Sequence, residues 1–432
     1  MSEFRTENAP IIVEADGFHL IDAQGHRYLD GHSSLWCNIH GHRVPAIDQA
    51  IRSQLDRVAH STLLGLSNGP SIELADELVR RTPEGLQKVF YADCGAAGVE
   101  VALKIAYQYY QQRANGKQIR DKFLHFDGAY HGDTIGTMSI GSIGRFKDLY
   151  NPLLFPVVWT SVPSASPDNP DLEQQQLEYW TSELEKLLEL HHETLAGVVI
   201  EPLVQAAAGI KVQATGFLKR ARELTRRFDT LLIADEIAVG FGRTGTLFAC
   251  EQEEVAPDIL ILSKGLTGGY LPLAATLVTD EIYEAFLGDP WLCRTFYHGH
   301  TYTGNPLACA AALASIQLID ENQVLKNAER LEGVLQRELA PLKSHANVKE
   351  IRQKGTMVGI ELTLDGDPFP AELRIGHRVT LECRKRGVVL RNIADVIVLM
   401  PAPAMLEQLA TELCQVVRES IFEVMQAVKQ QL

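Results

Sequence analysis

Short apolar runs alternate with helical patterns as far as about Asn305, and this alternation restricts the possible fold more than any other feature. Most of the runs are uniformly apolar, as is usual for strands that are covered on both faces. Helical patterns such as residues 97–112 and 217–228 lie between them. The order predicts an α/β fold with a mainly parallel central sheet and helices on both faces. The predicted strands are residues 88–92, 122–125, 197–200, 230–234, 259–262 and 273–279.

The pattern changes beyond Asn305. A long helical region is expected at 306–342 and connects the large domain, 51–305, to a smaller α+β domain at 343–432. The segment 1–50 is expected to form a small hairpin near Gly17 and Arg27 and to belong to the small domain. The predicted elements of the C-terminal domain are strands at 356–362, 388–391 and 396–400, a charged helix at 372–386 and an amphipathic helix from about 405.

The net charge and the distribution of the cysteines restrict the classes of function that this chain can have. The formal net charge is −15, whereas a general nucleic-acid or anionic-membrane binder normally carries the opposite sign. Seven single cysteines without a CxxC pair fit reduced thiols in a cytoplasmic protein better than a disulfide framework. The start has no apolar signal-peptide core, and the longest nearly apolar run, 307–319, is too short to span a bilayer. We therefore expect small-molecule substrates, with no nucleic acid and no membrane.

Two consecutive carboxylates, Asp235 and Glu236, follow the apolar strand at 230–234. Ligands of open α/β sheets bind at the carboxyl ends of the strands. A buried carboxylate at that place needs a cationic partner, because an unpaired one is very costly. A protonated pyridine nitrogen could serve as that partner, and the pair would make the ring an electron sink. An ordinary acidic loop is an equally good interpretation of this stretch taken alone.

Gly240, Gly242 and Gly245 match GxGxxG, the dinucleotide-binding fingerprint. That motif normally lies between the first strand of the fold and a helix, with an acidic residue roughly 20 positions further on. Here the glycines come in mid-chain, after two carboxylates, and no clear helix start follows them. We therefore interpret them as a tightly turning loop rather than a nicotinamide site.

Lys264 follows the apolar strand at 259–262 and precedes a glycine-rich turn. Lysines are almost never fully buried unless they are paired. Desolvation lowers the pKa of an amine, which suits Schiff-base chemistry. A surface lysine in a turn is the better interpretation of one lysine alone. However, Lys264 lies at the end of the strand that follows Asp235, and this position favours a catalytic role for the lysine.

Three further stretches could complete a site. Backbone N–H groups at Gly95 and Ala96, at a predicted strand-to-helix turn, could hold an anion. Tyr130 follows another strand and could stack on a planar cofactor, and the hydroxyl of Thr301 could reach a phosphate. Each stretch has an ordinary structural interpretation as well. We predict no metal site, because no histidine pair has a third and fourth ligand at a recognisable spacing; the pairs are His40/His42, His191/His192 and His298/His300.

Together these stretches resemble the class III (omega) aminotransferases, pyridoxal-phosphate enzymes of fold type I, over nearly the whole chain from about Gly17. The resemblance implies that Lys264 carries pyridoxal 5′-phosphate as a Schiff base and that Asp235 pairs with its ring nitrogen. Tyr130 would stack on the ring with His131 beside it. Phosphate would be bound by Gly95 and Ala96 of one subunit and by Thr301 of the other, which implies a homodimer with shared sites.

Within the class, the likeness is strongest to members that aminate 8-amino-7-oxononanoate to 7,8-diaminononanoate in biotin synthesis, with adenosylmethionine or lysine as amino donor. Trp36, Arg243 and Arg391 match substrate-pocket residues of those members, whereas Leu35 and Ala96 depart from the usual Trp and Ser or Thr. Other class III transaminases, acting on omega-amino acids or diamines, and an aminomutase or decarboxylase on the same fold remain alternatives. The supporting stretches are residues 31–41, 200–209, 235–245 and 298–306.

Overall fold

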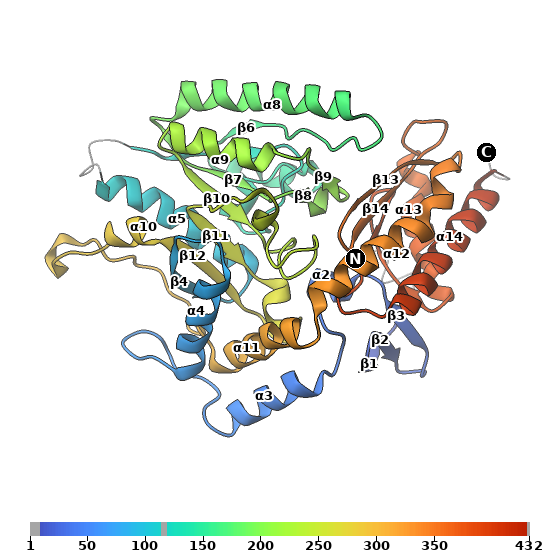
Figure 1. Cartoon of the computed structure of the whole chain (residues 1–432), viewed down its shortest axis with the longest axis horizontal. Coiled ribbons are helices and arrows are strands. Elements are labelled where there is room, and N and C mark those ends of the chain that lie inside the picture. The colour runs from blue at the N-terminus through green and yellow to red at the C-terminus, as the bar shows by residue number, and fades with distance from the viewer. Residues whose placement is uncertain (1–8, 114–118, 430–432) are drawn as a thin grey trace.

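A seven-stranded sheet with the order β4-β12-β11-β10-β7-β5-β6 forms the centre of the computed structural model, which describes residues 9–113 and 119–429 (Figure 1). All six predicted strands are confirmed, and the short edge strand β6 is an addition. In sheet order the strands are β4 (Leu86–Ala92), β12 (Ala274–Thr279), β11 (Ile259–Leu262), β10 (Leu231–Asp235), β7 (Leu195–Ile200), β5 (Lys122–Phe126) and β6 (Val158–Thr160).

The pairings from β11 to β6 are all parallel, which confirms the predicted mainly parallel sheet. Only β12 runs antiparallel to both of its neighbours, β11 and β4. A parallel neighbour needs a crossover connection of a dozen or more residues, usually a helix. The connection from β11 to β12 contains only the short 3-10 turn η4 (Lys264–Thr267). The chain therefore returns beside β11 in the opposite direction.

Helices cover both faces of this sheet, as predicted. Alternate residues of β10 belong to different hydrophobic clusters: Leu231 and Ile233 pack with α5 (Gly95–Arg113), and Leu232 and Ala234 pack on the other face. That other face is covered by α4 (Gly69–Arg81), α8 (Pro170–His191) and α9 (Phe217–Arg227). Burial on both faces explains why these strands are uniformly apolar.

The C-terminal residues form a second sheet, β13-β14-β17-β16, which is antiparallel throughout. Helices α12 (Val324–Leu339), α13 (Ile375–Lys385) and α14 (Glu407–Lys429) share one hydrophobic cluster with β14 and β17. The helical region expected at 306–342 is two helices, α11 (Pro306–Glu321) and α12, because Gln323 has a left-handed backbone with φ 50°. The strands are β13 (Val348–Lys354), β14 (Met357–Leu362), β16 (Arg391–Ile393) and β17 (Val396–Leu399).

The predicted N-terminal hairpin is confirmed as β2 (His19–Asp22) and β3 (Arg27–Asp30), and β1 (Ile12–Asp16) extends it. Strand β3 also pairs in parallel with β15 (Val388–Val389), so the two ends of the chain share one sheet. Helix α3 (Pro45–Leu55) follows the hairpin in the sequence and precedes the first strand of the large sheet, and it contacts α11.

None of the helices in the described ranges combines the length and the apolar composition that crossing a bilayer requires. All seven cysteines are free thiols, as expected from their spacing. The stretch on which the prediction about a signal peptide rests begins with residues 1–8, which lie outside the described residues.

Candidate active site

Strand pairing brings the predicted catalytic residues together at one edge of the large sheet. Asp235 ends β10 opposite Ile261 of β11, so Lys264, three residues further on, lies at the same edge. On the other side of β10, Ala234 pairs with Ile200 of β7, which places Glu201 beside Asp235. Because the carboxyl ends of parallel strands share an edge, residues far apart in the sequence become neighbours.

These residues open into a cavity of about 630 Å³. The wall includes most of the predicted site residues: Trp36, Gly95, Ala96, Tyr130, His131, Asp235 and Lys264. Thr301, Arg243 and Arg391 are not part of this wall. One cavity thus holds an amine, a carboxylate, an imidazole and a helix N-terminus, each from a different segment of the chain.

A buried, hydrogen-bonded pair of side chains, His131 and Asp235, lies in the wall of the cavity. Nδ1 of His131 donates a hydrogen bond of 2.7 Å to Oδ2 of Asp235, and the backbone N–H of Ile237 donates to Oδ1. Burial alone would lower the pKa of His131, but the hydrogen bond and the negative charge of Asp235 outweigh it and raise the pKa. The imidazole therefore fixes the orientation of Asp235 and partly neutralises it.

Glu201 is a second buried carboxylate at this edge. It accepts hydrogen bonds from the backbone N–H groups of Tyr130 and Ala206, both at 3.1 Å. Burial raises the pKa of Glu201 to about 7, with a further rise from Asp235 and an opposing effect of His131. Glu201 therefore ties the loop that carries Tyr130 to the end of β7.

Lys264 occupies a strained position, with φ 46° at a residue that is not glycine. Such a backbone costs on the order of 1–2 kcal/mol and persists only where the surroundings hold it. Its amine lies 4.8 Å from the ring centre of Trp36. Burial lowers the pKa of Lys264, against the opposing charges of Asp235 and Glu201. A buried amine with a lowered pKa is suited to act as a nucleophile.

The N-terminus of α5 forms another part of the wall. Gly95 begins this 19-residue helix, so its first N–H groups have no partner within the helix. A Cβ on Gly95 would meet Ile237 at 2.9 Å, and a Cβ on Gly132, which has φ +135°, would meet Ala96 at 2.6 Å. A larger residue at either place would therefore crowd its neighbour. Free N–H groups and the helix dipole suit an anion here.

Glu100 and Lys104 are four residues apart on α5, a spacing that would allow a contact on the helix surface, but each has a different partner. Glu100 accepts hydrogen bonds from Thr134 Oγ1 and from the backbone N–H of Gly136. Lys104 instead contacts the carbonyl oxygen of Tyr297 and the ring of His298. Tertiary partners satisfy both side chains better than a helix-surface pair, which is worth only about 0.2–0.5 kcal/mol. Glu100 therefore anchors the loop that follows His131.

A left-handed helical turn, α2 (Ser33–Trp36), delivers Trp36 to the cavity. All four of its residues have φ between 48° and 72°, and none is glycine. Each left-handed residue costs roughly 1–2 kcal/mol. The turn therefore needs strong support from its surroundings.

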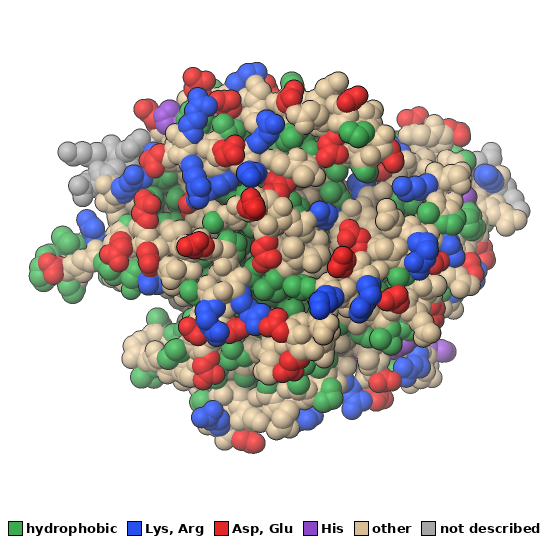
Figure 2. Space-filling model, in the orientation of Figure 1, with side chains coloured by type: hydrophobic (Ala, Val, Ile, Leu, Met, Phe, Trp, Pro, Cys, Tyr) green, Lys and Arg blue, Asp and Glu red, His purple; other side chains and the backbone are tan. Residues whose placement is uncertain are grey.

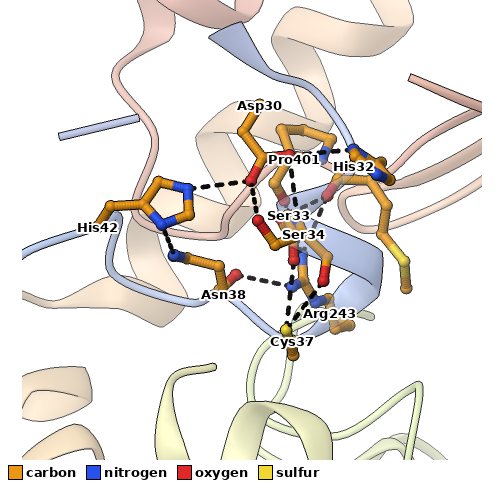
Figure 3. A network of polar contacts seen from close by, with 10 residues as sticks. Asp30, His32, Ser33, Ser34, Cys37, Asn38, His42, Arg243 and Pro401 are labelled. Atoms are coloured by element: carbon orange, nitrogen blue, oxygen red, sulfur yellow. Dashed lines mark hydrogen bonds and ion pairs between the residues drawn. The ribbon is translucent and has the colours of Figure 1, made fainter. Parts of the chain in front are cut away.

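Asp30 and Arg243 supply that support (Figure 3). Asp30 accepts hydrogen bonds from the N–H and the hydroxyl of Ser34 and from Nε2 of His42. Arg243 is completely buried and donates to Ser33 Oγ and to the carbonyl oxygen of Asn38. It also donates to the carbonyl oxygens of Met400 and Pro401, beyond β17.

The placement of Arg243 differs from the predicted substrate contact. Its guanidinium hydrogen-bonds four protein oxygens and lies outside the cavity wall. A cation buried in this way is held by the chain's own carbonyl groups, and burial lowers the pKa of Arg243 to about 10. In this structure Arg243 connects the N-terminal turn to the C-terminal segment.

Two other predicted residues also lie outside the wall. Arg391, on β16, is exposed, and its side chain has no ion pair or hydrogen bond within the described part of the chain, but its charge acts on Tyr130. Burial and a hydrogen bond to Asp133 raise the pKa of Tyr130, and Arg391 opposes that rise. Thr301 is exposed, beside a pair formed by His298 and His300 with 3.3 Å between their Nε2 atoms. Across residues 9–113 and 119–429, no three His, Cys, Asp or Glu side chains gather as metal ligands.

Neither Asp30 nor Glu201 is among the site residues that the sequence predicts. A usable signal for Asp30 is the serine-rich stretch that follows it, because side chains of that kind compete for backbone hydrogen bonds in turns. The partners of Asp30 and Glu201 come from other segments and are not visible in a local pattern.

Comparison with known proteins identifies related sequences. The family model for class-III aminotransferases matches residues 3–421. A relative from Nitratidesulfovibrio vulgaris, named adenosylmethionine-8-amino-7-oxononanoate aminotransferase, is 52% identical over 96% of this chain and 77% of its own length. A relative of the same name from Staphylococcus aureus is 42% identical over 98% of this chain and 94% of its own.

Solved structures agree. The crystal structure of adenosylmethionine-8-amino-7-oxononanoate aminotransferase from Methanocaldococcus jannaschii has a TM-score of 0.92 and 41% identity, and the match covers 98% of this chain and 95% of that one. An amine transaminase from an uncultivated Pseudomonas species, solved in its PLP-bound form, has a TM-score of 0.91 and 32% identity over 97% of this chain and 96% of its own.

The lowered pKa of Lys264 predicts its reactivity. Because burial disfavours the ammonium form, the neutral amine appears at lower pH than in an exposed lysine. Trace acetylation of the cofactor-free protein is measured at a series of pH values by peptide mass spectrometry. The midpoint of each lysine's labelling curve reports its pKa, whereas the accessibility of the lysine changes only the height of the curve. The midpoint for Lys264 should lie below that of Lys186, whose pKa the contact with Glu183 raises. A midpoint for Lys264 equal to or higher than that of Lys186 would contradict the lowered pKa of Lys264.

Proposed function

The chain belongs to the class-III aminotransferase family, and from this premise we propose that it aminates 8-amino-7-oxononanoate to 7,8-diaminononanoate, a step of biotin synthesis, with adenosylmethionine as amino donor. It is an enzyme, and its cofactor is pyridoxal 5′-phosphate. The observation that carries the proposal is the meeting of Lys264 and Asp235 in one cavity whose wall also contains Trp36. Free, scattered cysteines support a cytoplasmic location.

The residues of the cavity fit this cofactor. Lys264 places its amine in the cavity wall beside the ring of Trp36, and the buried carboxylate of Asp235 lies 2.7 Å from Nδ1 of His131. The N-terminus of α5 offers free amides for a phosphate. When bound, pyridoxal phosphate supplies an aldehyde that reacts with amines and a protonated ring that accepts electrons.

Each side chain then has a role that its surroundings support. Lys264 would hold the cofactor through its amine and, as a free amine, would move the proton at the Cα atom of the substrate. Asp235 would keep the ring nitrogen protonated, and His131 orients Asp235. Tyr130 would pack against the ring, and the bond from its N–H to Glu201 fixes the loop that carries it. The N–H groups of Gly95 and Ala96 would bind the phosphate.

Trp36 and Arg391 are the proposed substrate contacts. The acceptor carries a carboxylate at the end of an apolar chain, which an arginine fork and an indole suit. Arg391 fits because its guanidinium is unpaired among the described residues and lies near Tyr130. We do not assign Arg243 a direct contact, because its donors are already engaged.

We also propose a homodimer in which Thr301 completes the partner's phosphate site. Thr301 is exposed and does not reach the cavity of its own chain. The segment after α10 (Asp280–Glu284) projects from the body, and hydrophobic side chains gather on it (Figures 1 and 2). Trp291 and Tyr297 in this region are 75% and 73% exposed. Exposed apolar groups of this size are usual at subunit contacts.

The main test is spectroscopic and kinetic. The purified protein with pyridoxal phosphate should show a visible absorbance band, and Lys264→Ala should lose both the band and at least about a thousandfold in rate. Lys186→Ala, at an exposed ion pair, is the control and should behave as the parent. With adenosylmethionine as donor, 8-amino-7-oxononanoate should react faster than pyruvate. A colourless protein would end the proposal. A preference for pyruvate would indicate another class III transaminase. Activity only with lysine as donor would show that lysine, and not adenosylmethionine, supplies the amino group.

Arg391→Leu should raise the KM for 8-amino-7-oxononanoate by about 10–100-fold, because a charge-assisted bond to the carboxylate is lost. The KM for adenosylmethionine should change less, and Arg391→Lys should keep part of the affinity. Arg337→Leu, on the exposed face of α12, removes a similar charge far from the cavity and serves as the control. Equal KM values for parent and Arg391→Leu would remove this residue from the substrate site.

Sedimentation should give a mass of about twice 47.8 kDa. In that dimer, Thr301→Val should weaken the affinity for pyridoxal phosphate without changing the mass, because only a hydroxyl donor is removed. Thr303→Val offers a contrast, since Thr303 donates to the carbonyl oxygen of Tyr91 within its own chain. A monomer with full cofactor affinity would refute the shared site.

A further inference from the structure

The indole of Trp36 is placed by the backbone and not by a hydrogen bond of its own. Trp36 is 6% exposed, and its Nε1 finds no acceptor among the described residues. Its ring lies over the amine of Lys264. The position of the ring therefore depends on the conformation of the left-handed turn, Ser33–Trp36, which precedes Cys37.

Asp30 is the acid that holds this turn. Its Oδ1 accepts from the N–H of Ser34 at 3.0 Å and lies 3.0 Å from Nδ1 of His32. Its Oδ2 accepts from the hydroxyl of Ser34 at 2.7 Å and from Nε2 of His42 at 3.0 Å. Figure 3 shows these groups converging on the one carboxylate.

The surroundings require a carboxylate and not an amide at position 30. Asn38 Oδ1 accepts from the N–H of Gly41, so the amide nitrogen of Asn38 faces Nδ1 of His42 and donates to it. Nε2 of His42 must then carry the proton that it donates to Asp30. An asparagine at position 30 would direct an N–H group at this proton or at the backbone N–H of Ser34.

We propose that Asp30 is a positioning residue that fixes Trp36 over the Lys264 amine, and that it thereby sets the affinity for the apolar chain of the keto-acid substrate. The substrate part rests on the proposed function, whereas the placement of Trp36 does not. Asp30 itself contacts neither the cavity nor Lys264. Its effect passes through Ser34 and the strained backbone.

Fluorescence tests the placement without any substrate. The emission of Trp36 is obtained as the difference between each protein and the same protein with Trp36→Phe, because Trp159, Trp180 and Trp291 also emit. In Asp30→Asn the emission of Trp36 should shift to the red and become easier to quench with acrylamide. In the holoenzyme, the KM for 8-amino-7-oxononanoate should rise at least about tenfold, with kcat changed less.

A rescue experiment separates positioning from general stability. Leu35 has φ 70° and a side chain that is 46% exposed, so Leu35→Gly relieves strain in the turn with little loss of packing. Added to Asp30→Asn, it should restore the emission of Trp36 and most of the KM. Glu254→Gly relieves a left-handed residue, φ 56°, at an exposed site at the end of a distant 3-10 turn. Glu254→Gly should raise the melting temperature by a similar amount, but it should restore neither the emission of Trp36 nor the KM.

The possible outcomes separate the two proposals. Unchanged Trp36 emission in Asp30→Asn, or equal recovery with Glu254→Gly, would overturn the positioning role. A shifted emission that only Leu35→Gly reverses supports that role even if 8-amino-7-oxononanoate proves not to be the acceptor. A shifted emission with an unchanged KM would overturn the link between the position of Trp36 and substrate affinity.

Discussion

Parallel pairing of β7, β10 and β11 is the constraint on which the site depends. It fixes Glu201, Asp235 and Lys264 at neighbouring strand ends, where burial makes each charge costly. The chain meets this cost by shifting protonation. Burial raises the pKa of Glu201 and lowers that of Lys264, whereas Asp235 raises that of His131. The same shifts that make the charges tolerable also leave an amine able to react and a carboxylate held in one orientation.

Part of the backbone strain in the described residues lies beside this edge. Lys264 and the four residues of the turn Ser33–Trp36 have left-handed backbones without glycine, and the ring of Trp36 lies over the amine of Lys264. Strain of this kind persists only where surrounding groups over-determine the conformation. For the turn these groups are Asp30 and Arg243, whose partners lie on both the N-terminal and the C-terminal segments. The rigidity of the cavity wall thus has an identifiable source.

The sequence predicted the parts of the structure that depend on local patterns. The apolar runs predicted the six main strands, and their order along the chain predicted Asp235 and Lys264 at one edge. The antiparallel direction of β12 was not predicted, since it follows from the length of one connection. The network of Arg243 was not predicted either, because its acceptors, such as Ser33 and Pro401, lie more than 150 positions away in the sequence. Long-range polar contacts leave no periodic pattern in a single sequence.

Different parts of the structure hold the reacting groups of the cavity and the indole of Trp36. The groups proposed for the chemistry are fixed by the paired strands of the large sheet. Trp36, by contrast, is held by a turn that is tied to Met400 and Pro401 of the C-terminal unit through Ser33 and Arg243. The position of Trp36 therefore depends on long-range polar contacts, whereas the positions of Asp235 and Lys264 depend on strand pairing.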